Sequence, residues 1–193
     1  MEIQTPLRTD KKLPIQVLYL SFIEYIVLVF KKMKVWIIHN STYGNGKSIA
    51  EAMGEIFREK MEVEIRHVKK VTPRQVAEDK PDLIIIGTPV RMFSTSIVSK
   101  MWIRELKKQL REVDYVIPLG VVYLTHVMPK KPVEFWGKRF HKILDGGIAI
   151  AEVYPDWLSG QVKDTEGPLI DGTIDNFVLI ARQIQENIIT TKK

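Results

Sequence analysis

The chain contains no cysteine among its 193 residues. This absence excludes a disulfide framework, a thiolate metal site and a cysteine nucleophile, so other side chains must supply stability and chemistry. None of the four histidines lies near another His, Asp or Glu at a spacing that predicts a metal site, so no metal is expected. A chain without cysteine is typical of a cytoplasmic protein, which is the location that we expect.

Glycine and proline are also sparse, with 11 and 10 residues, which excludes a low-complexity or collagen-like chain. The apolar share of 45% is sufficient for one compact domain. Lysine and arginine outnumber aspartate and glutamate by 29 to 23, which gives a net charge of +6 and favours anionic partners. Because neither an aromatic-lined basic platform nor a recognition helix is evident, nucleic acid is not an expected partner.

Residues 1–32 differ from the rest of the chain. The run from Leu13 to Phe30 is almost entirely apolar and is flanked by lysine pairs, but it is short for a hydrocarbon layer of about 30 Å and contains Glu24. It is either a membrane anchor, which would give membrane association through residues 13–30, or an appended segment or upstream-start artefact preceding Met33. We therefore divide the chain into an extension, 1–32, and a domain, 33–193.

From residue 34 onward, short β-rich runs alternate with helical patterns. The predicted strands are 34–39, 63–67, 82–86, 115–121 and 148–153. Between the second and third strands, Thr72, Pro73 and Gln75 predict a helix that begins with a capping box. Five strands that alternate with five helices predict a doubly wound α/β domain, with a five-stranded parallel sheet and helices on both faces.

The loop after the first strand predicts a phosphate site. Its residues are small or carry hydroxyl groups, and a helix follows directly, so main-chain amides converge at a helix N-terminus that favours an anion. The candidate residues are Ser41, Thr42, Tyr43, Gly44, Asn45, Gly46 and Lys47.

Two nucleotide-binding patterns compete for this loop. The P-loop pattern G-x-x-x-x-G-K-[ST] is met at Gly46, Lys47 and Ser48, but Ser41 stands where its leading glycine belongs. The carboxylate that helps hold Mg²⁺ at the end of a second strand is also missing, since 83–86 is followed by Gly-Thr-Pro. A P-loop-like kinase or NTPase is therefore kept as an alternative.

The loop more closely resembles the flavodoxin signature S-x-x-G-N-T-x-x-x-A, which Ser41, Gly44, Asn45 and Ala50 match after the strand residues Ile37 and Ile38. The resemblance covers most of residues 34–190 and implies the strand order 2-1-3-4-5 and an FMN cofactor. Gly46 replaces the usual threonine and removes one hydroxyl donor to the phosphate. The ammonium group of Lys47 is either a compensating contact or a solvated charge.

The resemblance also implies two flavin loops, one after the third strand and one after the fourth. The residues of the first are Thr88, Pro89, Val90, Arg91, Met92 and Phe93, and those of the second are Tyr123, Leu124, Thr125 and His126, within a loop that runs to Met128. Met92 and Phe93 are expected either to pack on the flavin ring or to be core residues. Tyr123 is expected to stack on the ring, with Thr125 or His126 reaching a polar ring atom.

The function that the resemblance implies is FMN-dependent electron transfer, or a small flavin-dependent oxidoreductase. The chemistry then belongs to the cofactor, no catalytic side chain is needed, and a redox partner protein or a small-molecule electron acceptor is the expected partner. A second alternative is a cofactor-free flavodoxin-like interaction module, if Gly46 weakens the phosphate site. The long connection 154–172 is expected to be a polar surface loop anchored by Trp157.

Overall fold

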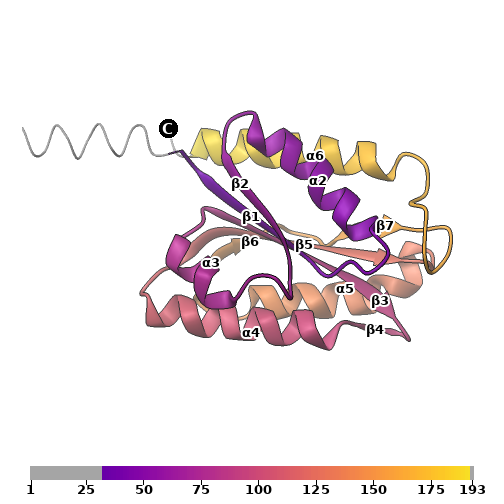
Figure 1. Ribbon diagram of the computed structural model, residues 1–193, viewed down its shortest axis with the longest axis horizontal. Helices are drawn as coiled ribbons and strands as arrows, with labels where there is room; N and C mark the ends of the chain where they lie inside the picture. The colour runs from indigo at the N-terminus through magenta and orange to yellow at the C-terminus, as the bar shows by residue number, and fades with distance from the viewer. Residues whose placement is uncertain (1–31, 192–193) are drawn as a thin grey trace, which may run out of the picture. The chain divides into compact units, whose positions relative to one another are not determined.

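The computed structural model describes residues 32–191, and the apolar run 13–30 lies outside the described residues (Figure 1). Within that described range, no helix combines the length and the apolar character needed to cross a membrane.

The domain is built on a parallel sheet that confirms the predicted strand order. The main strands are β1 (Lys34–His39), β2 (Glu62–His67), β3 (Leu83–Arg91), β5 (Ile117–His126) and β6 (Ile150–Val153). They lie in the order β2-β1-β3-β5-β6, and all neighbours are parallel. Counted without the two short strands, this is the order 2-1-3-4-5.

Two short strands were not predicted. β4 (Ser94–Thr95) pairs antiparallel with the end of β3, and β7 (Leu158–Gln161) pairs parallel with the second half of β5. Since β6 pairs with the first half of β5, two segments separated by residues 154–157 share the edge position of the sheet. The connection expected to be a loop therefore contains a strand.

Five helices of the described chain cover the two faces of this sheet. They are α2 (Asn45–Arg58), α3 (Pro73–Asp79), α4 (Ile97–Glu112), α5 (Lys130–Asp145) and α6 (Thr173–Thr191). Figure 1 shows α2 and α6 on one face and α3, α4 and α5 on the other.

The side chains of β1 show why both faces need helices. Val35 and Ile37 pack into the core beneath α2 and α6, whereas Trp36 and Ile38 pack into the core beneath α3, α4 and α5. All four are buried, because a strand inside a doubly covered sheet has no solvent-facing side.

The third and fourth predicted strands were too short. β3 continues beyond Ile86 to Arg91, and β5 continues beyond Val121 to His126. The added residues find ladder partners that a single run of sequence does not reveal, because β5 pairs with β3 and β7 along these stretches and β4 pairs with the end of β3. Residues expected in two flavin loops thus lie largely in strands.

Candidate functional site

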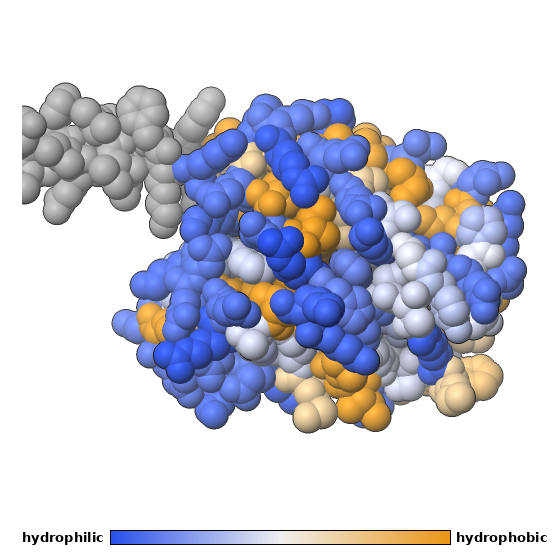
Figure 2. Space-filling model, in the orientation of Figure 1, coloured by the Kyte–Doolittle hydropathy of each residue, from blue (hydrophilic) through white to orange (hydrophobic). Residues whose placement is uncertain are grey.

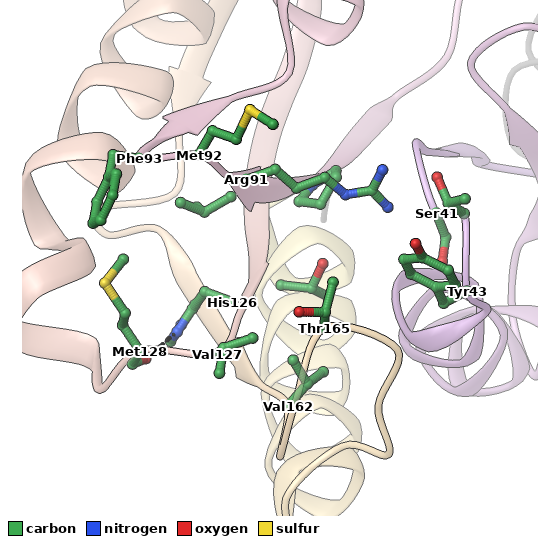
Figure 3. Close-up of a pocket in the computed structure, with 14 residues that line it drawn as sticks. Ser41, Tyr43, Arg91, Met92, Phe93, His126, Val127, Met128, Val162 and Thr165 are labelled. Carbon is green, nitrogen blue, oxygen red and sulfur yellow. Dashed lines mark hydrogen bonds between the residues drawn. The ribbon is translucent and has the colours of Figure 1, made fainter.

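A cavity of about 430 Å³ lies at the carboxyl ends of β1, β3 and β5 (Figure 3). Its volume lies within the range of small-molecule sites, and its position is the one that doubly wound sheets use for ligands. Ten predicted site residues line it: Ser41, Thr42, Tyr43, Pro89, Val90, Arg91, Met92, Phe93, Thr125 and His126.

The loop between β1 and α2 presents free donors at one end of the cavity. Gly44 has φ of 93°, a left-handed conformation that glycine adopts without steric cost, and α2 begins directly after it with no acid in its first turn. The main-chain amides of Thr42, Tyr43 and Gly44 donate to no other residue within the described range. Ser41 Oγ accepts a 3.1 Å hydrogen bond from the Gly46 amide, which leaves its own proton to donate. The loop therefore presents hydrogen-bond donors of the kind that bind an anion at a helix N-terminus.

The remaining predicted residues of this loop face other parts of the protein. Asn45 Nδ2 donates to the Glu166 carbonyl oxygen at 2.8 Å, and Lys47 Nζ lies 3.2 Å from Glu51 Oε1 at the surface. Gly46 is buried. Gly44, Asn45, Gly46 and Lys47 are thus outside the cavity lining.

At the other end of the cavity, β3 and β4 form a tight hairpin around Met92 and Phe93. Their φ angles are 45° and 55°, so two bulky residues occupy the left-handed region that a two-residue hairpin of this type requires. Both side chains are exposed, at 96% and 71%, so the expectation that they are core residues is wrong. Left-handed bulky residues are strained, and such strain is concentrated at functional sites.

Among residues 32–191, Arg91 is the one charged side chain that lines the cavity. Its guanidinium carbon lies 5.2 Å from the centroid of the Tyr43 ring, so a cation–π contact joins the hairpin to the first loop. The part of the chain that the structure describes thus gives the cavity a positive charge and no lining carboxylate, which suits an anionic ligand.

His126 lines the cavity but has no free ring nitrogen. Its Nδ1 lies 2.6 Å from the Met128 carbonyl oxygen, and its Nε2 lies 2.8 Å from Ser159 Oγ. Since a carbonyl only accepts, Nδ1 carries the proton and Nε2 accepts from the serine hydroxyl. Burial lowers the pKa of this imidazole, which keeps it neutral. The expected contact from His126 to a ligand ring atom is not available in this arrangement, whereas Thr125 remains at the cavity wall.

Three other predicted residues lie outside the cavity. Tyr123, expected to stack on a flavin, is buried beneath α2 and α6, with its ring 5.7 Å from that of Phe177. Leu124 points into the opposite core, and Thr88 is buried, with an Oγ1 that has no hydrogen-bond partner within residues 32–191. Alternation along the longer strands directs Tyr123 and Leu124 away from the site.

Four lining residues were not singled out from the sequence: Val127, Met128, Val162 and Thr165. The first two belong to the loop predicted after the fourth strand. The other two follow β7, in a segment that Asp164 Oδ1 organises by accepting from the amides of Glu166 and Gly167 at 2.9 and 3.1 Å. The unusual length of the connection 154–172 was the feature of the sequence that could have pointed to Val162 and Thr165.

His39 lies beneath the first loop at the end of β1. Its Nδ1 accepts from the Ser41 amide at 3.4 Å, and its ring centroid lies 5.3 Å from that of His67. Burial, with added repulsion from His67 and Lys47 against an opposing effect of Glu51, lowers the pKa of His39 to about 4. The neutral imidazole of His39 therefore supports the loop between β1 and α2 from beneath. Within the described part of the chain, no three His, Asp or Glu side chains are grouped closely enough for a metal ion.

Comparison with known proteins identifies the family. The family model described as a flavodoxin domain matches residues 36–135, which is more than half of the chain and includes all three predicted loops of the site, 41–47, 88–93 and 123–128. The chain belongs to the flavodoxin-domain family. No curated protein matches it.

Solved structures show the same fold as this flavodoxin domain at low sequence identity. A flavodoxin from the domain Archaea is 17% identical, with a TM-score of 0.57 over 81% of this chain and 99% of its own. A WrbA-like flavodoxin from Agrobacterium tumefaciens is 16% identical, with a TM-score of 0.63 over 83% and 99%. The rubredoxin oxygen:oxidoreductase of Desulfovibrio gigas is 14% identical, with a TM-score of 0.64 over 91% of this chain and 41% of its own. This chain spans about two fifths of the length of that last protein.

Proposed function

We propose that this flavodoxin domain binds FMN and transfers electrons between the flavin and a redox partner protein or a small-molecule acceptor. The observation that carries the proposal is one cavity with free main-chain amides at one end and apolar side chains at the other. FMN has the matching polarity, with a phosphate ester at one end and a flat, largely apolar ring system at the other.

The donor set of the cavity fits this cofactor. The hydroxyl groups of Ser41 and Thr42 lie with the free amides of the first loop. The lining that the described residues form includes Arg91 but no carboxylate that would repel a phosphate. When bound, FMN supplies one- or two-electron chemistry, and the protein supplies binding, orientation and access.

The residues around the ring end then have distinct tasks. Met128 and Val90 provide apolar contact for a planar ring and exclude water from its faces. Neutral His126 holds the shape of the wall through its two hydrogen bonds and adds no charge. Thr125 offers a hydroxyl group to a polar ring atom.

The proposal is tested by titrating FMN and riboflavin into the full chain by calorimetry and visible spectroscopy. FMN is expected to bind with one flavin per chain, and riboflavin, which lacks the phosphate, more weakly. Thr42→Val keeps the side-chain shape but removes the hydroxyl group, so it should weaken FMN binding several-fold and leave riboflavin binding unchanged. Absence of FMN binding to the folded protein contradicts the proposal.

The same titration includes Mg²⁺ with ATP. Nucleotide binding in place of FMN binding would support the P-loop-like alternative, and binding of neither ligand would support the interaction module. Membership of the flavodoxin-domain family favours FMN over both.

A further inference from the structure

The outer surface of α4 and α5 exposes several large apolar side chains. Met92 and Phe93 project from the hairpin, Ile97 and Met101 from α4, and Phe135 from α5, all with more than half of their surface exposed. Figure 2 shows apolar atoms along the lower edge of the view, where Figure 1 places α4 and the β3–β4 hairpin. Scattered single residues of this kind need no explanation, but a concentration of them indicates an interaction site.

These side chains belong to one surface. The Phe93 ring lies 6.1 Å from that of Trp136, and the Phe135 ring lies 6.0 Å from the same indole. Lys100 on α4 donates to Ser94 Oγ in β4 at 3.2 Å, which joins the helix to the hairpin. We call this region the α4–α5 surface; it comprises Met92, Phe93, Ile97, Lys100, Met101, Arg104, Phe135 and Arg139.

The excess positive charge of the chain is concentrated in the same two helices. α4 and α5 together carry ten lysines and arginines against four acids, whereas the remaining residues of the chain carry nineteen of each. The rest of the sequence is therefore balanced, and the net charge of +6 arises from one layer of the fold.

Three cations of this surface lack an acidic partner. Lys100, Arg104 and Arg139 form no ion pair with any residue of the described range, although Lys108 and Lys138 on the same helices do. Burial, together with repulsion from Arg139 and Arg104, lowers the pKa of Lys100. Like charges held together without a counter-ion predict an anionic partner.

We propose that the α4–α5 surface docks on an anionic lipid membrane, with the apolar side chains entering the interface and the cations contacting lipid headgroups. A bilayer accepts apolar side chains that project from a tip, and it attracts neighbouring lysines and arginines. A protein partner would need recesses matched to Met92 and Phe93, which the left-handed hairpin holds outward. The observations therefore favour a membrane over an acidic protein.

The absence of cysteine allows a position-specific test on the full chain. Met101→Cys, labelled with an environment-sensitive fluorophore, reports on the α4–α5 surface. Leu179→Cys on α6 is the matched control, because its parent residue is 56% exposed against 62% for Met101 and lies on the opposite face of the sheet. Each labelled protein is mixed with phosphatidylcholine vesicles and with vesicles that also contain phosphatidylglycerol, without added FMN.

The Met101 label should shift to the blue with anionic vesicles, respond much less to pure phosphatidylcholine, and lose the response as salt rises. Arg104→Gln with Arg139→Gln should reduce apparent vesicle affinity several-fold, whereas Lys69→Gln with Lys70→Gln, an equal charge loss outside this surface, should change it much less. Equal shifts at both labels would place attachment elsewhere on the chain and overturn the proposal. A response to soluble polyglutamate but not to vesicles would overturn it in favour of an acidic protein.

Discussion

The hydroxyl group of Tyr123 donates a 2.5 Å hydrogen bond to the carbonyl oxygen of Gly46, in the first turn of α2. Strand β5 is thereby tied directly to the proposed phosphate loop. The ring lies against Gly87 of β3, where an added Cβ would be 1.9 Å from Tyr123 Cζ. A residue expected to contact the cofactor therefore supports the loop from beneath, and only glycine at position 87 leaves room for it.

Tyr123→Phe should weaken this support. The ring and its contact with Phe177 are kept, but one buried hydrogen bond is lost, so the free energy of unfolding should fall by about 1 kcal/mol. FMN affinity should fall as well, because the loop loses its tie to β5. Denaturant unfolding and FMN titration measure the two effects. Tyr154→Phe, whose hydroxyl makes no hydrogen bond within residues 32–191, is the control, and equal losses in the two variants would contradict this role.

Met92→Asn should stabilise the protein by about 0.5 to 1 kcal/mol, because asparagine adopts positive φ at lower cost than methionine. Little contact is lost, since Met92 is almost fully exposed. Met101→Asn, at a helical and similarly apolar position of α4, should instead destabilise by about 0.5 kcal/mol through lower helix propensity. Thermal or denaturant unfolding of both variants tests the difference in sign; destabilisation by Met92→Asn would show that the hairpin is not strained.

The stability of the protein should decrease as the pH falls from about 6.5 toward 4. Above that window His39 is neutral in both the folded and the unfolded chain. Within it the unfolded chain binds a proton that the folded chain excludes, because burial lowers the folded-state pKa to about 4. The free energy of unfolding should therefore fall by up to about 1.4 kcal/mol per pH unit from this group. His39→Asn should flatten the profile between pH 7 and 5 in denaturant titrations, and an unchanged slope would exclude His39 as its source.

A positive cavity should raise the potential of bound FMN, because reduced flavin tends to be anionic. Arg91→Gln should make the two-electron potential more negative by about 20 mV, equivalent to about 1 kcal/mol, since Arg91 is the lining cation. Lys47→Gln should change it much less, because Lys47 is paired with Glu51 and outside the lining. Redox titration of the FMN-loaded variants measures both values. A wild-type potential as low as that of an acidic flavodoxin would argue against this electrostatic effect.

Local signals in the sequence predicted much of the fold. The range of β1 was predicted without error from the β-rich run KVWIIH, and the five residues that follow Lys34 are buried in the structure. The capping box of α3 was also predicted: the Gln75 amide donates to Thr72 Oγ1 at 3.3 Å, and the Thr72 amide donates to Gln75 Oε1 at 2.8 Å. Both features depend on residues close together in the chain.

The errors arose where distant segments decide the structure. The ends of β3 and β5 depend on pairing with β4 and β7, and β7 has the short sequence LSGQ, which carries no strong strand signal. With those ends misplaced, Tyr123 was assigned to a loop and to the cofactor. Val162 and Thr165 were missed because they reach the cavity only through the pairing of β7 with β5. Three of the seven residues predicted from the first loop line the cavity, against seven of the ten predicted from the other two loops.

The confinement of the excess charge to α4 and α5 gives this domain a permanent charge asymmetry across its sheet. In the field of a negatively charged object, such a molecule experiences a torque as well as an attraction. The protein therefore rotates until the layer of α4 and α5 faces the negatively charged object before contact, and dissolved salt weakens this orienting effect. Since the strained hairpin lies beside that layer, the mouth of the cavity approaches the negatively charged object in a defined orientation and not in a random one.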